Sequence, residues 1–528
     1  MSSGGHRGGL NMLGVDVCLD EDKLTNAPHC PHGPALLFER YIGDTVETRR
    51  TQQYYGCSAC RDRKDCDFFQ NVGEKVSEAS QKAREMRNNA QQPWKSHADC
   101  YSRYTQTMNA KEQERRYCHQ CSLFLMPDEI KLHRNHNVTH GLSLAQMQKP
   151  SHLLKPIENK KTNAQYLFSD NAVDFLLDTI SKLGFKKVLC VGAPRIHEAI
   201  QVDKLKGLES LLLDLDHRYG QFYPPDLFCR YNMCNHYFMD GDESQDVFRK
   251  FLNNDEDDDI VMVTDPPFGG LVEVIAFGVK WIMETWKQIN NKDDKSSLPT
   301  MWVFPYFLES RIKACLPSFT MLDYKVAYDN HPLFQNKAKG NKKGSPVRIF
   351  TNIDASKFVL PKQEGYRYCS PCTRYVSSEN HHCKQCQACT SKDGSTYKHC
   401  DVCQKCVKPS YTHCITCQRC ELPTHSCNKM LQGCHICGAS DHKRRECPNR
   451  GHHQRPNQSN TKKRKHQGGV STPPKSQKLL SQTKTVAIGN QDSFKRKNIS
   501  SDMKQSTSGV QKKKARNKKN KKKKWTKS

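Results

Sequence analysis

The sequence predicts an α/β core built on a mainly parallel sheet, together with several small metal-binding modules and a disordered basic tail. Three observations predict it. Strand-like and helix-like signals alternate between residues 155 and 355, as they do where helices join parallel strands. Most of the 27 cysteines lie outside that segment, in clusters that also contain histidines. Lysine and arginine dominate the chain from Gly451 onward.

The composition narrows the classes of protein to consider. A formal net charge of +28 favours a polyanionic partner, and a mean hydropathy of -0.82 places much of the chain outside any core. The tail, residues 451–528, carries 23 Lys/Arg against Asp492 and Asp502, so most of the charge is local. We expect neither a secretory signal nor a membrane span, since no apolar leader or long apolar run is present. Clustered Cys and His then indicate metal sites in a reducing compartment.

Residues 1–26 are expected to be a disordered lead and residues 27–72 a first zinc finger. Thiolate and imidazole ligands for one tetrahedral zinc site are available, with Cys60 close enough to compete. The expected ligands are Cys30, His32, Cys57 and Cys66. Aromatic residues on both sides of Cys57 and Cys66 supply stacking surface. The arrangement resembles the GRF-type zinc finger, a module associated with single-stranded nucleic acid, although the tripeptide that names the family is absent.

A polar linker or helix is expected over residues 73–112, and a second finger over residues 113–142. Cys118 and Cys121 are followed by three histidines, which makes a Cys2His2 zinc site plausible. Distance from the cysteine pair favours His133 as the third ligand. We expect His136 as the fourth ligand and keep His140 as its substitute, because histidine spacing fits the pair His136/His140 better.

Residues 155–355 are expected to fold as the sheet. An amphipathic helix over residues 171–183 precedes the first strand, residues 187–191, which ends at Gly192. Further strands are expected at residues 211–213, 227–232, 260–264 and 301–304, with an antiparallel pair at residues 320–328 and 347–351. This order resembles the Rossmann-like fold of class I methyltransferases, and the resemblance covers nearly all of the segment.

Asp265-Pro266-Pro267-Phe268 directly follows a buried strand, at the sheet edge where ligands bind. An exocyclic amino group is a poor nucleophile, so an enzyme must hold it by acceptors: the Asp265 carboxylate and the Pro266 carbonyl are expected to act so. Pro267 stiffens the turn, and Phe268 offers a face for a flipped-out base. The four residues resemble the (Asp/Asn)-Pro-Pro-aromatic motif of amino methyltransferases, which use S-adenosylmethionine to methylate adenine N6, cytosine N4 or glutamine N5.

That resemblance implies a cofactor site around the first strand. The turn at Gly192 is the expected cradle, although it departs from the family's glycine-rich form, and Arg195 suits the methionine carboxylate. The expected acceptor of the ribose hydroxyls is Asp214, with Asp216 as second choice. Asp265 is also expected to contact the cofactor.

Two more segments are assigned to the cofactor. Gln165-Tyr166-Leu167-Phe168 resembles the segment that amino methyltransferases fold over the cofactor, and a plain strand or staple entering the next helix is the equal alternative. Asn235, with Asn232 and His236 nearby, is placed to reach the cofactor's adenine. The alternative for these three polar residues is a solvated loop.

Residues 366–428 are expected to be a cysteine-rich zinc ribbon, in which a His-Cys-x2-Cys-x2-Cys unit occurs three times after an opening Cys-x2-Cys. The repeat leaves open which sulfurs share an ion. The expected ligands are Cys369, Cys372, Cys383, Cys386, Cys389, Cys400, Cys403, Cys406, Cys414, Cys417 and Cys420. The block resembles the ribbon of DHHC-type proteins, but the acyltransferase tetrapeptide is absent, so that activity is rejected.

Residues 432–449 match the spacing of a retroviral-type zinc knuckle, with Cys434, Cys437, His442 and Cys447 as ligands. Such knuckles bind unpaired bases. The tail that follows, residues 451–528, is too polar and too Lys-rich to fold by itself. We expect a nuclear or nucleolar address and an RNA-binding arm there, or a merely solubilising tail.

The combination of modules resembles the zinc finger CCHC-domain N6-adenosine methyltransferases of ribosomal RNA, from about Cys30 to Cys447. The resemblance implies methyl transfer to adenine N6 in large-subunit, 28S-type ribosomal RNA, in support of ribosome function and translation. It also implies zinc, a single-stranded or looped RNA substrate, ribosome-associated or helicase proteins as partners, no DNA, and a nuclear, nucleolar and cytoplasmic location. The alternatives are an amino methyltransferase of DNA or protein glutamine, and a non-catalytic zinc-rich RNA-binding scaffold.

Overall fold

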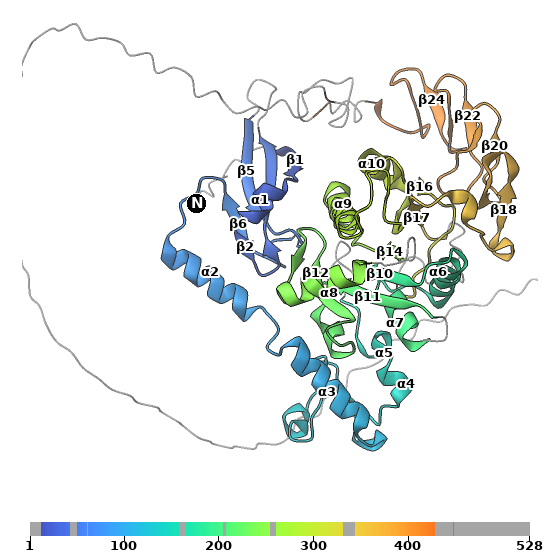
Figure 1. The fold of residues 1–528 in the computed structure, drawn as a ribbon. Coiled ribbons are helices and arrows are strands. Elements are labelled where there is room, and N and C mark those ends of the chain that lie inside the picture. Colours follow the sequence, from blue (N-terminus) through green and yellow to red (C-terminus); the bar gives the residue numbers. More distant parts are fainter. Residues whose placement is uncertain are drawn as a thin grey trace, which may run out of the picture. The chain divides into compact units, whose positions relative to one another are not determined.

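The computed structural model describes residues 12–42, 50–60, 62–157, 165–203, 207–253, 260–330 and 344–427, together with Cys434 and Cys447 (Figure 1). Two expected knuckle ligands, Cys437 and His442, and the whole basic tail lie outside the described residues. None of the described helices combines the length and the apolar character that a membrane crossing requires.

The centre of the fold is an eight-stranded sheet with the order β13-β12-β11-β10-β14-β15-β17-β16. Its strands are β10 (Lys187–Val191), β11 (Glu209–Asp214), β12 (Phe228–Asn232), β13 (Tyr237–Phe238), β14 (Ile260–Thr264), β15 (Thr300–Pro305), β16 (Thr320–Met321) and β17 (Val347–Thr351). Strands β12, β11, β10, β14 and β15 are parallel, and β17 inserts antiparallel between β15 and β16. The predicted Rossmann-like α/β core is confirmed.

Helices cover both faces of this sheet, and alternate residues of each strand explain why. In β10, Val188 and Cys190 enter one core cluster while Leu189 and Val191 enter the other. Helices α6 (Asp170–Lys182) and α7 (Pro194–Val202) contribute to the first cluster. The second cluster is completed by α8 (Asp242–Leu252), α9 (Val272–Ile289) and α10 (Glu309–Cys315). The sheet is therefore buried on both faces, and its carboxyl edge is left for a site.

The first finger is built on a second sheet, with the order β1-β4-β5-β6. Its strands are β1 (Met12–Cys18), β4 (Leu36–Ile42), β5 (Arg50–Gly56) and β6 (Phe69–Asn71), and a short hairpin is formed by β2 (His29–Cys30) and β3 (Gly33–Pro34). The expectation of a disordered lead is wrong for residues 12–26. They form β1, which pairs antiparallel with β4, and the short helix α1 (Glu21–Thr25). The composition of residues 12–26 did not indicate this strand, because its backbone hydrogen bonds come from pairing with β4.

The remaining elements are short, apart from two helices in the linker. These are α2 (Glu78–Ala90) and α3 (His97–Asn109), each capped by a serine side chain. The second finger has β7 (Arg116–Cys118), β8 (Leu123–Phe124) and β9 (Val138–His140), followed by α4 (Leu144–Met147) and α5 (Pro150–Leu153). The ribbon is a series of hairpins, β18 (Tyr366–Cys369) with β19 (Arg374–Ser377), β20 (His382–Cys383) with β21 (Ala388–Cys389), β22 (Lys398–Cys400) with β23 (Lys405–Val407), and β24 (Thr412–Cys414) with β25 (Arg419–Glu421).

Candidate active site and metal centres

A cavity of about 610 Å³ opens at the carboxyl ends of β10, β11, β12 and β14. The sequence-predicted residues that line it are Gln165, Tyr166, Gly192, Asp214, Asp216, Asn232, Asp265, Pro266, Pro267 and Phe268. They come from five separate stretches of the chain. The sheet topology brings them together, because parallel strands end at one edge.

The turn at Gly192 explains how a single glycine serves this site. Gly192 has a φ of +64°, and its N–H donates to the Leu213 carbonyl. A Cβ added there would lie 3.2 Å from the backbone oxygen of Asp265. Glycine is therefore required both for its backbone conformation and for the close approach of β10 to the Asp-Pro-Pro-Phe motif.

Asp265 is enclosed by protein but keeps a face on the cavity. Its backbone N–H donates to the Val191 carbonyl, and its carboxylate accepts a hydrogen bond of 2.8 Å from the Tyr328 hydroxyl. Burial raises the pKa of Asp265 well above its usual range, and the hydrogen bond from Tyr328 opposes that rise. The ring of Phe268 lies 6.0 Å from the ring of Tyr166 and 5.8 Å from that of Tyr328. A carboxylate and an aromatic face thus share one corner of the cavity.

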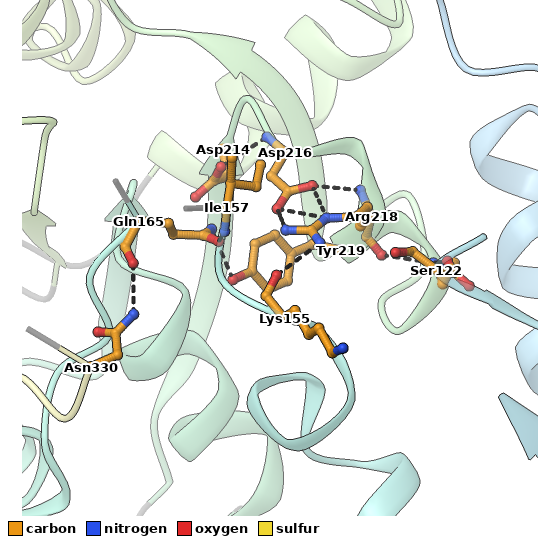
Figure 2. A network of polar contacts seen from close by, with 10 residues as sticks. Ser122, Lys155, Ile157, Gln165, Asp214, Asp216, Arg218, Tyr219 and Asn330 are labelled. Carbon is orange, nitrogen blue, oxygen red and sulfur yellow. Dashed lines mark hydrogen bonds and ion pairs between the residues drawn. The ribbon is translucent and has the colours of Figure 1, made fainter. Parts of the chain in front are cut away.

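Asp214, the last residue of β11, and Asp216, two residues further on, have different surroundings (Figure 2). Asp216 is bound by both ends of the Arg218 guanidinium, at 2.9 Å from Nε and 2.7 Å from Nη2. Asp214 instead accepts a hydrogen bond of 2.9 Å from the Asp216 N–H. Burial, and next the charge of Asp216, raise the pKa of Asp214 to about 7. This geometry favours Asp214, the first choice, because the Asp216 carboxylate is already committed to Arg218.

Gln165 anchors the predicted cofactor segment to three neighbours (Figure 2). Its side chain accepts from the Ile157 N–H and donates to the Tyr219 hydroxyl, both at 3.3 Å, and its carbonyl accepts from Asn330 Nδ2 at 2.8 Å. Gln165 and Tyr166 face the cavity, as a cofactor-covering segment requires. Leu167 and Phe168 do not line the cavity, and Phe168 is buried in a backbone bridge with Tyr328. Gln165 and Tyr166 therefore fit a cofactor-covering segment, whereas Leu167 and Phe168 fit a strand or staple that enters the next helix.

Arg195 and Asn235 do not line the cavity, and both assignments need correction. The Arg195 guanidinium is taken up by ion pairs with Asp170 and Glu198 at the start of α6 and within α7. Asn235 Nδ2 donates to two backbone carbonyls of the first finger, those of His32 at 3.1 Å and Pro34 at 2.7 Å. Asn235, which the sequence assigned to the cofactor, instead attaches the first finger to the core.

That module forms part of the cavity wall, which sequence reasoning missed. His32, Ala59 and Cys60 of the first finger line the cavity beside the end of β12. Asn232 Nδ2 donates to the His32 carbonyl and to the Ser58 hydroxyl, each at 2.8 Å. No sequence signal marks this contact, because its partners lie 200 and 174 positions apart.

Both predicted finger quartets are assembled in the structure. The ligand atoms of Cys30, His32, Cys57 and Cys66 lie within 4.8 Å of one another, and so do those of Cys118, Cys121, His133 and His136. Each group is suited to one tetrahedral metal ion. His140, the substitute, is elsewhere: its Nδ1 accepts from Arg116 Nε at 3.1 Å.

The ribbon resolves the pairing that the sequence left open. Each Cys-x2-Cys joins the histidine and the last cysteine of the following hairpin. The resulting quartets are Cys369, Cys372, His382 and Cys389; Cys383, Cys386, His399 and Cys406; and Cys400, Cys403, His413 and Cys420. The residue after each Cys-x2-Cys has a φ near +50°, at Thr373, Gln387, Gln404 and Gln418. The same tight turn thus presents both sulfurs of a pair to one ion.

Several potential ligands of the ribbon were missed from the sequence. The histidine that opens each repeat is one, and the signal for it was its fixed place directly before a cysteine. A truncated last unit is another, in which Cys414 lies 3.7 Å from Cys427, and His425 lies 3.4 Å from Cys417 and 3.3 Å from Cys427. Of the knuckle, Cys434 and Cys447 are described and pack with Tyr41 of β4.

Comparisons with known proteins agree with this site. A family model described as probable N6-adenine methyltransferase matches residues 159–338. The human rRNA N(6)-adenosine-methyltransferase ZCCHC4 is 52% identical over 450 residues, which are 84% of this chain and 87% of the human protein. The mouse protein of the same name is 52% identical over 447 residues, 84% and 86% of the two chains. The one from Xenopus tropicalis is 52% identical over 448 residues, 84% and 91%.

Proposed function

The chain belongs to the rRNA N(6)-adenosine-methyltransferase family, and from that membership we propose that it methylates the N6 of an adenine in large-subunit ribosomal RNA. The single observation that carries the proposal is the Asp265-Pro266-Pro267-Phe268 corner, which lies open on a cavity of about 610 Å³. Bound S-adenosylmethionine would supply the electrophilic methyl group.

The corner's own residues hold the amine. An ionised Asp265 accepts one amino hydrogen through the oxygen that Tyr328 does not occupy, and the Pro266 carbonyl accepts the other. Both acceptors pull the hydrogens away from the nitrogen lone pair, which is then left to face the methyl carbon. Phe268 offers the stacking face for the extruded base. After transfer the N6 nitrogen loses one of its hydrogens as a proton, which the Asp265 carboxylate or water accepts. Orientation of the amine supplies most of the acceleration.

Asp214 gives the cofactor site a pH dependence. A carboxylate accepts both ribose hydroxyl hydrogens, whereas a protonated Asp214 offers a donor in their place. Because the pKa of free Asp214 is raised to about 7, the affinity for S-adenosylmethionine should rise about tenfold per pH unit below 7 and level off above it. Calorimetry from pH 5.5 to 8.5 would measure this. Asp214→Asn should bind weakly at every pH, and a wild-type affinity that falls with rising pH would exclude the role.

The finger sheet carries a surface suited to unpaired bases. Phe38, Tyr54 and Phe69, one from each of β4, β5 and β6, stack in sequence with ring centroids 5.6 and 5.0 Å apart. Arg40 lies over the Tyr54 ring and Arg63 over the Phe69 ring, at 5.4 and 4.1 Å. Aromatic rings and guanidinium groups together recognise bases and phosphates without strong sequence preference. We name this row the aromatic ladder.

The ladder and the active site belong to one substrate path. The finger that carries the ladder also supplies His32, Ala59 and Cys60 to the cavity wall. A single RNA strand bound to the ladder would therefore lie on the same module that borders the cofactor site. Among the residues that the structure describes, six thiolate–imidazole clusters lie in the zinc modules, and all are suited to Zn²⁺ by ligand type.

The decisive experiment is methylation of fractionated cellular RNA by the purified protein, followed by nucleoside analysis. N6-methyladenosine should form in the large-subunit ribosomal fraction, with little in a matched single-stranded DNA or in a glutamine peptide. Tyr54→Ala should raise KM for RNA about 5- to 100-fold, the range expected for one lost base stack, while leaving S-adenosylmethionine affinity alone. Methylation of DNA or peptide in preference to RNA would replace the proposal with one of its alternatives.

A further inference from the structure

Tyr328 is buried directly beside Asp265, the proposed catalytic carboxylate. Its hydroxyl donates to Asp265 Oδ1 at 2.8 Å, and it is the hydrogen-bond partner of that carboxylate among the described residues. Its side chain is 2% exposed. Burial raises the pKa of Tyr328 well above its usual range, so the hydroxyl keeps its proton and remains a donor.

The ring of Tyr328 is equally well placed. It lies edge-on to the Phe268 ring at 5.8 Å, and 6.0 Å from that of Tyr166. The Phe168 ring packs on it at 5.2 Å. Tyr328 therefore touches the base-stacking residue, the cofactor segment and the carboxylate at once.

The backbone around Tyr328 fixes this position. Residues 327–330 run beside residues 165–169, and four hydrogen bonds join the two segments: Ser169 to the Ala327 carbonyl, Asp329 to the Leu167 carbonyl, and Asn330 with both Leu167 and Gln165. Gln165 and Tyr166 line the cofactor cavity. Tyr328 thus connects residues 165–169, the first two of which border the cofactor cavity, to Asp265, which receives the substrate amine.

From these contacts we propose that Tyr328 is a positioning residue for methyl transfer, which orients the Asp265 carboxylate so that its second oxygen receives the substrate amine. The inference rests on the proposed function. A buried carboxylate without this donor could rotate, and both oxygens would compete for the amine. With Oδ1 occupied, one acceptor faces the cavity in a fixed direction.

Tyr328→Phe tests the hydroxyl while keeping the ring. We expect kcat to fall about 10- to 100-fold, as for a lost hydrogen bond to a charged group, with KM for RNA and affinity for S-adenosylmethionine within about threefold. The acid limb of kcat, measured at saturating S-adenosylmethionine, should move to higher pH. The sign follows because the Tyr328 hydrogen bond lowers the pKa of Asp265, so its removal raises that pKa.

Tyr366→Phe is the matched control. The hydroxyl of this buried tyrosine accepts from the Lys325 N–H at 2.9 Å and makes no contact with Asp265. The control should lose comparable thermal stability while its kcat and acid limb stay those of the wild type. Two results would overturn the proposal: wild-type kinetics in Tyr328→Phe, or a lower kcat with an unshifted acid limb, which would indicate packing alone. Because wild-type methylation is measured in the same series, failure of this inference is distinguishable from failure of the proposed function.

Discussion

Asp265→Ala should lower the methylation rate by about 100- to 1,000-fold, the cost of removing one preorganised charge-stabilising group, with RNA and S-adenosylmethionine affinities preserved within severalfold. In the proposed mechanism the carboxylate acts on the amine during transfer, whereas the aromatic ladder binds the RNA. Single-turnover methylation, together with separate titrations of RNA and cofactor, would separate the two roles.

Asp265→Asn provides the graded comparison. An amide keeps an acceptor oxygen and the size of the side chain, and its NH₂ can donate to the Tyr328 hydroxyl, which is also an acceptor. This variant should therefore retain more activity than Asp265→Ala. Because an amide does not titrate, the acid limb of kcat, measured at saturating S-adenosylmethionine so that Asp214 does not contribute, should also disappear. Equal loss of RNA binding and methylation in a folded Asp265→Ala protein would remove Asp265 from the catalytic role.

The core could be predicted because its signals are local. Residues 188–191 of β10 and all of β14 are buried, and each run is followed directly by a residue that breaks the apolar pattern, Gly192 or Asp265. The expected strand at residues 320–328 is regular only over Thr320–Met321. Beyond it the N–H groups of Leu322 and Val326 still donate to carbonyls of β17, and the chain then places Tyr328 against Asp265. A tyrosine near a predicted strand is taken for a core residue, so the hydrogen bond from Tyr328 to Asp265 could not be inferred from the sequence.

Contacts between modules were beyond sequence reasoning. The sequence around Asn235 would be the same whether its side chain faced a cofactor or donated to the carbonyls of His32 and Pro34, which are 203 and 201 residues away in the chain. The ribbon presents the opposite case. Its repeat indicated which residue types bind metal, but identical units do not show which of them share an ion. Only the packing of successive hairpins determines that each Cys-x2-Cys shares its ion with ligands of the following hairpin.

Disrupting the metal quartet of the first finger should strongly weaken cofactor binding. Its histidine, His32, lines the cavity, and the His32 carbonyl receives hydrogen bonds from Asn232 and Asn235. Structural Zn²⁺ contributes about 10–16 kcal/mol to the folding of small fingers, so Cys57→Ser should unfold this module and with it one wall of the site. The eight-stranded sheet has its own core on both faces and should survive.

Cys403→Ser is the matched change in a ribbon quartet, none of whose ligands lines the cavity. We expect S-adenosylmethionine affinity to drop more than about tenfold in Cys57→Ser and to stay within about threefold in Cys403→Ser, as coupling through a shared wall requires. Calorimetry would measure both, with far-UV circular dichroism to follow the sheet and metal content to verify each loss. Unchanged affinity in a Cys57→Ser protein that has lost its metal would mean that the finger only borders the cofactor site, because a wall that can unfold without cost to binding holds nothing in place.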